Sequence, residues 1–377
     1  MCDTIQITGS FDGGNPKDPD SIIQTGPNSF TVIPFSEDND PNYKFRLDIK
    51  VFNHTADIIK SNLSIDWQEP KFNPLRDYVY LKQASDPDWT YVPMRVNGTK
   101  TEGQLNFRPG ETYVCLHPKY SYGDYLRFVS ALEESELIKK EKIGLSAEGR
   151  EIWMVKINSD GSYGNGKKPI MIVARVHPYE TSGSYCIEGI INHYLKTLSP
   201  FPFHISPIYK NLSPFTFHLS PTYHLSPIYL IPMANPDGVF NGFCKRTGRN
   251  GLDVSKVLDF NDPTTATIRK GVDAVRPNIY CEFHNWMFKN TDGIYYLNRL
   301  QAWRFKRMFP SQKRFGKRWR TLYRMFFRKT APVGFKKYCL EKFHSICIAL
   351  EFPWFRRSAD DMRRIGVHTA HTLAKTL

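Results

Sequence analysis

Residues 171–180, Met-Ile-Val-Ala-Arg-Val-His-Pro-Tyr-Glu, decide the fold of the larger part of this chain. The apolar, β-branched run that begins at Met171 follows a Gly-Asn-Gly-Lys-Lys turn and predicts a buried strand. A helical pattern begins near Thr181, so the chain turns at the carboxyl end of this strand, where ligands bind in open α/β sheets. His177 and Glu180 lie in that turn, at a spacing that lets an imidazole and a carboxylate converge on one cation, and both groups suit Zn²⁺.

The length and composition of the chain limit the class of protein it can be. With 377 residues, 41% of them hydrophobic and 14% aromatic, the chain is long enough for two domains and a sizeable core. The seven cysteines are scattered and form no Cys-x-x-Cys pair, so we expect neither a disulfide framework nor a thiolate zinc site. The amino terminus has no basic and apolar leader, and no apolar run approaches about 18 residues, so we expect a cytoplasmic protein without a membrane partner.

The positive charge of the chain is concentrated in one stretch. The formal net charge is +14, and residues 299–337 contain 14 lysines and arginines and no acidic residue. Aromatic residues are interleaved with them, a composition that is common in polyanion-binding proteins. Spacings such as Trp303 with Arg307 and Leu322 with Phe326 also fit amphipathic helices with solvated basic side chains. We favour such helices over a nucleic-acid site at Arg299–Lys337.

Residues 1–118 are predicted to form an all-β domain. Short alternating runs, such as those that begin at Phe30, Tyr43 and Tyr78, are separated by clusters of Gly, Pro, Asn and Asp. Strands at this spacing, without a long helical period, indicate a β-sandwich. No cluster of catalytic residue types occurs here, so we expect this domain to be structural or to shape access to a site in the second domain, residues 119–377.

The second domain is predicted to alternate strands and helices, as α/β domains do. Ser121 or Asp124 can cap a first helix with an apolar face. Apolar periodicity then predicts paired strands at 143–157, helices at 181–198, around 266–275 and at 360–377, and strands at 171–176, 228–233, 279–284 and 345–351.

Residues 199–227 are predicted to be a loop insertion in this domain. They contain two consecutive copies of a 14-residue unit rich in Ser, Pro and Phe. Proline every few residues excludes both a helix and a central strand. The segment lies between a helix and the next strand, on the side of the sheet opposite the strand carboxyl ends. His204, His218 and His224 are therefore interpreted as copied loop residues and not as metal ligands.

Three predicted strands end in residues that can bind a metal or serve it: His177 with Glu180, then His284, then Glu351. Each is commonplace alone, because a lone His at a strand end is usually a satisfied polar residue and a lone Glu is usually an ion-pair partner. Their occurrence in one α/β domain, in this order and with an Asn235-Pro-Asp-Gly turn between them, favours a catalytic metal site with three protein ligands.

With these features the sequence resembles the M14 family of zinc metallocarboxypeptidases. The matching motifs are His177-Pro-Tyr-Glu180, Asn235-Pro-Asp-Gly-Val239, Gly251-Leu-Asp253, Glu282-Phe-His284 and Leu350-Glu351. The cytosolic carboxypeptidase branch is similar in layout, with an N-terminal β-sandwich joined to the catalytic domain by a Tyr-rich segment. The resemblance implies a mixed, doubly wound α/β sheet with helices on both faces, preceded by the all-β sandwich.

The resemblance also implies residue roles. One zinc ion would be bound by His177, Glu180 and His284, and Glu351 would be the general base that takes a proton from water and passes it to the leaving amine. Asp253 would hold His177 in the metal-binding tautomer. The implied reaction is hydrolysis of a C-terminal or side-chain-linked amide in a peptide or protein. The basic character of the chain would favour an acidic substrate, such as a glutamate-rich tail or a peptidoglycan stem.

One motif departs from the family in the residues that would grip the substrate. The family's Asp-x-Asn-Arg, whose last two residues bind the terminal carboxylate, is Asp253-Val-Ser255-Lys256 in this chain. Lys256 offers a positive charge without the bidentate fork of an arginine. Recognition of a terminal carboxylate is therefore expected to differ from that of the family.

Two further positions stay open at the level of sequence. The family arginine that polarises the scissile carbonyl is matched by either Lys245 or Arg246. Tyr323 and Tyr338 are the candidates for the family's substrate tyrosine. The alternative functions are a related zinc amidase or deacylase that recognises no peptide terminus, and a basic polyanion-binding module on the same fold.

Overall fold

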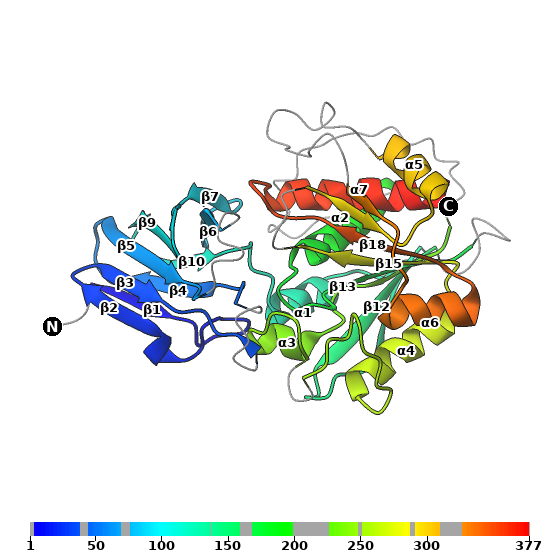
Figure 1. Ribbon diagram of the computed structural model, residues 1–377, viewed down its shortest axis with the longest axis horizontal. Coiled ribbons are helices and arrows are strands. Elements are labelled where there is room, and N and C mark those ends of the chain that lie inside the picture. The colour runs from blue at the N-terminus through cyan, green and yellow to red at the C-terminus, as the bar shows by residue number, and fades with distance from the viewer. Residues whose placement is uncertain are drawn as a thin grey trace.

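The computed structural model describes residues 4–37, 44–68, 76–135, 137–158, 168–198, 226–247, 251–286, 291–309 and 326–376 (Figure 1). Nearly all of the predicted insertion at 199–227 lies outside these residues, and so do His204, His218, His224 and Tyr323. The remaining predicted site residues all lie within the described ranges.

The N-terminal part is a sandwich of two five-stranded sheets. The first sheet has the order β1 (Ile5–Thr8), β4 (Asp48–Asn53), β10 (Gly110–Cys115), β6 (Tyr78–Gln83) and β7 (Thr90–Pro93). The second has the order β2 (Ile22–Gly26), β3 (Ser29–Val32), β5 (Ile59–Asp66), β9 (Lys100–Phe107) and β8 (Arg95–Asn97), and a short 3₁₀ helix, η1 (Pro19–Ser21), precedes β2. Inward residues of both sheets share one apolar core, which confirms the predicted all-β architecture.

The second part is built on an eight-stranded mixed sheet. Its order is β11 (Ile138–Leu145), β12 (Glu151–Ile157), β14 (Ile228–Ile231), β13 (Ile170–Ala174), β15 (Ile279–His284), β18 (Ile346–Glu351), β16 (Gly293–Tyr295) and β17 (Phe326–Arg328). The four strands from β14 to β18 in this order run parallel, whereas β11, β12 and β16 pair antiparallel with their inner neighbours. The mixed α/β fold predicted from the sequence is confirmed.

Helices cover both faces of this sheet (Figure 1). Strand β13 shows why both faces must be covered: Ile170, Ile172 and Ala174 belong to one apolar core, and Met171 and Val173 belong to the other. A parallel strand that is buried on both faces has no polar side, so its sequence is a continuous apolar run. The helices are α1 (Tyr122–Ser130), α2 (Ser182–Leu198), α3 (Pro236–Asn241), α4 (Pro263–Val275), α5 (Arg299–Met308), α6 (Gly334–Phe343) and α7 (Ala359–Thr376).

Helices α2 and α7 form the layer on one face, and α4 and α6 lie on the other (Figure 1). The first two cross closely because glycines stand at the crossing. A Cβ atom on Gly189 would lie 2.1 Å from the carbonyl oxygen of Arg363, and one on Gly366 would lie 1.9 Å from that of Cys186. Any side chain at either position would force the two helices apart.

The order of the central strands places the site. The chain leaves β13 through α2 to β14 on one side of β13, and then passes through α4 to β15 on the other side. The segments that follow the carboxyl ends of β13, β14 and β15 therefore diverge at this point, which is where open α/β sheets bind their ligands. His177, Asn235 and His284 all lie at or just after these ends.

Several local predictions are confirmed and two are wrong. Ser121 caps α1 in a reciprocal capping box with Asp124, as its position before the apolar periodicity indicated. Asn235-Pro-Asp-Gly is not a simple turn, because the Asn235 side chain caps α3, which begins at Pro236. Phe326 lies in β17 and not in an amphipathic helix, since this segment pairs with the sheet edge at β16.

Two further findings concern the kind of protein. All six cysteines in the described residues are buried and unpaired, as expected for a chain without a disulfide framework. Among the helices of the described residues, none has the length and apolar character needed to cross a membrane.

Candidate metal centre

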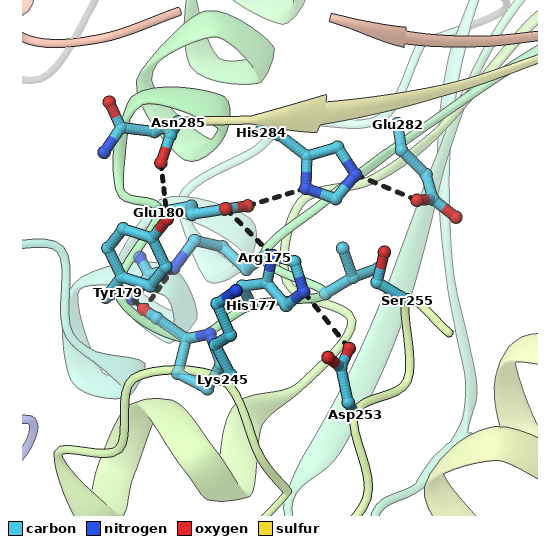
Figure 2. A network of polar contacts seen from close by, with 12 residues as sticks. Arg175, His177, Tyr179, Glu180, Lys245, Asp253, Ser255, Glu282, His284 and Asn285 are labelled. Carbon is cyan, nitrogen blue, oxygen red and sulfur yellow. Dashed lines mark hydrogen bonds and ion pairs between the residues drawn. The ribbon is translucent and has the colours of Figure 1, made fainter. Parts of the chain in front are cut away.

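Three side chains from two neighbouring strand ends converge on one point (Figure 2). Both oxygens of the Glu180 carboxylate face an imidazole: Oε1 lies 2.8 Å from Nδ1 of His177, and Oε2 lies 2.8 Å from Nδ1 of His284. Each residue offers one donor atom, and these atoms lie within 4.8 Å of one another in a buried group. The predicted grouping of His177, Glu180 and His284 is therefore what the tertiary structure produces.

The outer nitrogen of each imidazole faces a second carboxylate. Nε2 of His177 lies 3.1 Å from Oδ1 of Asp253, and Nε2 of His284 lies 3.0 Å from Oε2 of Glu282. When Nε2 carries the ring proton and donates to that acid, Nδ1 presents its lone pair to the interior of the group. This is the usual arrangement around metal-binding histidines.

The electrostatics of the group favour a cation at its centre. Burial lowers the pKa of an imidazole, but the carboxylates of Glu180, Glu282 and Glu351 together outweigh burial and raise the pKa of His284 to about 10. The pKa of His177 is raised in the same way, by Glu180 and Asp253. Two imidazole nitrogens and a carboxylate that attract a positive charge so strongly are the donor set of catalytic Zn²⁺ sites, so these residues fit the ion.

Glu351 stands beside this group without belonging to it. It is the last residue of β18 and pairs in register with His284 on β15. Its Oε2 atom is buried and has no hydrogen-bond partner in the described part of the chain. Burial raises the pKa of Glu351 to about 7, although the neighbouring His284 opposes this effect. A carboxylate with a pKa near neutrality can both accept and return a proton at physiological pH.

The geometry separates the two basic residues that the sequence left open. The side chain of Lys245 lies beside His177 (Figure 2), and its charge is the smallest of the effects that favour the ionised forms of Glu351 and Asp253. The Arg246 guanidinium instead donates to the carbonyl oxygen of Gly251, 2.7 Å away, and so braces the loop. The Lys245 ammonium group also lies over the Phe45 ring, 5.8 Å from its centre.

The N-terminal sandwich holds this loop in place. Oε1 of Glu37 accepts hydrogen bonds from the backbone N–H groups of Lys245 and Arg246, at 2.6 and 3.0 Å. Arg46 of the same sandwich donates to the carbonyl oxygen of Phe243, at 2.8 Å. The sandwich thus contributes no donor atom to the metal group but fixes the backbone that presents Lys245.

The departure at Ser255 and Lys256 has a structural counterpart. Ser255 is buried, and its Oγ and carbonyl oxygen lie 3.4 Å from Nζ of Lys336. Lys256 is 58% exposed, and its ammonium group lies 3.3 Å from Oδ2 of Asp253. Neither side chain therefore reproduces a preformed bidentate clamp for a terminal carboxylate.

Lys336 and Glu282 form further contacts behind His284; the sequence assigned a role to neither residue, although Glu282 stands in the Glu282-Phe-His284 motif. Lys336 lies on α6 and Glu282 on β15, and their side chains form an ion pair with exposed fractions of 1% and 0%. Burial alone would raise the pKa of Glu282, but the Lys336 ammonium and the contact with His284 lower it to about 2. A chain of contacts thus runs from Ser255 through Lys336 and Glu282 to His284. The signals in the sequence were an acid inside an apolar strand and its place in the Glu282-Phe-His284 motif.

Arg175 is a second residue that was missed. It ends the β13 segment in a left-handed backbone conformation, with φ 59°, and is fully buried. Its Nε atom donates to the carbonyl oxygen of Pro178 at 2.9 Å, and its Nη1 atom donates to that of Tyr120 at 2.8 Å. Burial lowers the pKa of Arg175 to about 9. The guanidinium therefore shapes the turn that carries His177, and its signal was a charge within an apolar run.

Tyr338 is not a substrate tyrosine. Its hydroxyl donates to Oδ1 of Asp273 at 2.7 Å, near the end of α4 that leads into β15. That end of the sheet is opposite the strand carboxyl ends, so Tyr338 is on the wrong side of the domain.

Residues 125–293 match the zinc carboxypeptidase family, peptidase family M14. The matched range contains His177, Glu180, Asp253 and His284, and it ends before Glu351.

Among curated proteins, the chain is similar to cytosolic carboxypeptidases. It is 25% identical to cytosolic carboxypeptidase 2 of Homo sapiens over 207 residues, which is 51% of this chain and 21% of that protein. It is 29% identical to cytosolic carboxypeptidase 6 of Mus musculus over 127 residues, which is 33% of this chain and 20% of that protein. The chain therefore spans about a fifth of the length of these relatives.

Solved structures share the fold over nearly the whole chain. A metallo-carboxypeptidase from Burkholderia cenocepacia superposes with a TM-score of 0.75 at 14% identity, covering 98% of both chains. A metallo-carboxypeptidase from Pseudomonas aeruginosa gives the same TM-score at 16% identity and the same coverage. This likeness extends through the N-terminal sandwich as well as the α/β domain.

Proposed function

We propose that this protein is a zinc-dependent metallocarboxypeptidase that hydrolyses a C-terminal or side-chain-linked amide of a peptide. The observation that carries the proposal is the convergence of the two Nδ1 atoms and the Glu180 carboxylate, with Glu351 beside them, whose Oε2 atom has no hydrogen-bond partner among the described residues. His177, Glu180 and His284 would hold one zinc ion. When bound, zinc supplies a Lewis acid that polarises a carbonyl and lowers the pKa of water to about 7.

The residues of the chain then have distinct tasks. Glu351 takes a proton from the attacking water and delivers it to the nitrogen of the leaving amine, which its raised pKa permits. Lys245 supplies a positive charge for the oxygen that becomes negative as the carbonyl is attacked. Asp253 and Glu282 keep the two imidazoles in the tautomer and orientation that the site requires.

A related zinc amidase or deacylase is the second candidate, and one observation favours it. The Ser255 hydroxyl contacts the buried Lys336, and Lys256 pairs with Asp253, so the two positions that bind a terminal carboxylate in the family are engaged within the protein. A substrate without a terminal carboxylate would lose nothing by this change.

The proposal also covers the class of substrate and the location of the protein in the cell. The excess of positive charge favours an acidic peptide or protein substrate. A cytoplasmic location is consistent with the cytosolic carboxypeptidase relatives and stays a prediction. Polyanion binding by residues 299–337 also stays a prediction, since residues 310–325 lie outside the described part and Lys336 is buried inside the domain.

The test compares two variants of the zinc-loaded protein on a panel of peptides with acidic, basic and apolar C-terminal residues. Glu351→Gln should retain zinc, because this side chain is not among the three donors, and should lower kcat by a factor of about 10² to 10⁴. His284→Ala should lose zinc itself. Retention of full activity by Glu351→Gln would refute the assignment of the base.

The same panel separates the two candidates. Peptides with amidated C-termini should be poor substrates of a carboxypeptidase and equally good substrates of an amidase. Zinc occupancy without turnover of any peptide, but with turnover of acylated amines, would replace the first candidate with the second.

A further inference from the structure

A cavity lies at the seam between the sandwich and the α/β domain, away from the metal group. Its volume is about 330 Å³. Strands β6 and β10 line it from the sandwich, and α1, α2 and α7 line it from the other domain. In Figure 1 this is where β6 and β7 approach the layer formed by α2 and α7. No residue of the metal group contributes to its wall.

The charged side chains of this seam pocket do not balance. Two acids line it, and both are already engaged: Asp124 pairs with Lys119 and Arg127, and Glu188 pairs with Arg363. Four cationic side chains line it, so the wall carries an excess of positive charge. A cavity with such a wall attracts anions.

Two of the cations have donors to spare. Within the described residues, the Lys82 ammonium group forms no hydrogen bond and no ion pair, although the side chain is half-buried. Arg363 uses Nε for Glu188, at 3.0 Å, and its two terminal nitrogens donate to no described residue. The neighbouring Asp88 accepts the N–H of Trp89 and forms no ion pair with Lys82. The ammonium and the planar guanidinium can therefore bind one carboxylate together.

Lys82 and Arg363 are close enough to repel each other. Burial is the main cause that lowers the pKa of Lys82; the nearby Asp88 carboxylate opposes burial, and the charge of Arg363 lowers the pKa further. An anion between the two cations would relieve both effects, because it would replace lost hydration and screen like charges.

The remaining wall is aromatic. Trp89, Tyr113 and Tyr185 line the cavity. Nε1 of Trp89 lies 3.3 Å from the hydroxyl of Tyr185, and the Arg363 guanidinium lies over the Tyr185 ring, 5.2 Å from its centre. These contacts hold the rings in place, so a flat apolar group can pack against surfaces that are already ordered.

We propose that the seam pocket is a binding site for a small aromatic carboxylate, whose carboxylate is bound by Lys82 and Arg363 and whose ring packs against Trp89. The site is independent of the proposed reaction, since none of these residues touches the metal group. It lies across the seam, so a bound molecule joins the sandwich to α7.

The test is calorimetric titration of the zinc-loaded protein with benzoate, and with benzamide and acetate as matched probes. Benzoate should bind at the pocket, and benzamide and acetate should each bind at least about tenfold more weakly, because one lacks the charge and the other lacks the ring. Equal affinity for benzoate and benzamide would overturn the proposal, and so would an absence of saturable benzoate binding.

Two lysine variants test whether benzoate binds in the seam pocket. Lys82→Gln should weaken benzoate binding at least about tenfold, whereas Lys60→Gln, on the exposed face of β5, should leave it unchanged. Lys82 is half-buried and forms no ion pair with a described residue, so its replacement should not lower the melting temperature. Binding of benzoate at the metal group would survive Lys82→Gln, and unchanged affinity in that variant would therefore refute the seam pocket as the site.

Discussion

Replacement of Lys336 by methionine should strongly destabilise the α/β domain, although this residue belongs to the most basic stretch of the chain. The three N–H donors of its ammonium group face three acceptors: the Glu282 carboxylate and the hydroxyl and carbonyl oxygens of Ser255. Methionine fills a similar volume but leaves the Glu282 carboxylate as a buried charge without its partner.

The magnitude follows from burial. The two side chains are 1% and 0% exposed, so solvent does not screen their interaction. Removal of one partner from a fully buried ion pair costs about 3–5 kcal/mol. For a domain of this size each kcal/mol corresponds to about 2–4 °C, so the melting temperature of Lys336→Met should fall by roughly 6–20 °C.

The assay is thermal unfolding followed by circular dichroism, with zinc removed by a chelator so that metal binding does not mask the effect. Lys337→Met is the matched control, because Lys337 is 61% exposed and pairs with Glu341 only at the surface, at 3.7 Å. This control should remain within about 0.5 kcal/mol of the unmodified protein.

A double variant tests the cause. Lys336→Met combined with Glu282→Gln removes both charges and should recover part of the lost stability. Zinc competition with a chelator should show a metal affinity about 10–100-fold weaker for Glu282→Gln alone, because the outer partner of His284 is changed. A loss below about 1 kcal/mol for Lys336→Met, or a double variant less stable than the single one, would refute this reasoning.

Three other predictions concern the loop at the site and the seam. Lys245→Met should lower kcat by a factor of about 10² to 10³ while zinc is retained. Arg246→Met should mainly lower the melting temperature, because its guanidinium holds the loop at Gly251. Steady-state kinetics that show the larger loss of kcat for Arg246→Met would contradict the assignment. Glu37→Gln should lower kcat and stability together, by about 1–3 kcal/mol in stability, because a charged acceptor of two backbone N–H groups is lost; calorimetry and kinetics measure both. Burial opposes the low pKa of Asp124, but Lys119 and the Ser121 cap lower it below 3.8. Since its stabilising effect is present above that pH and lost below it, Asp124→Asn should be less stable at pH 7, and its difference from the unmodified protein should shrink as the pH falls below 3.8 in unfolding titrations.

The sandwich and the α/β domain contribute to the metal group in different ways. The donors all come from the α/β domain, but Glu37 and Arg46 of the sandwich bind the backbone on either side of Cys244. We expect the sandwich to be required for full activity for this reason. The division of the chain at residue 118 stays a prediction.

The amino-acid sequence by itself determined the central strands and the residues that converge at the candidate metal centre. Apolar runs that end in His177, His284 and Glu351 specify buried parallel strands, and the carboxyl ends of neighbouring parallel strands meet at one edge of a sheet. The residues were therefore predictable because they depend on local patterns and on a topological rule.

Only the tertiary structure decided which side chains support these residues. Glu282, Lys336 and Ser255 come from three separate segments, and no local pattern records that their side chains meet inside the domain. The choice between Lys245 and Arg246 likewise depends on the direction of two adjacent side chains, which Glu37 of the sandwich sets through the backbone. The physical reason is the same in each case: the contact energy of a buried polar group depends on partners that are distant in sequence.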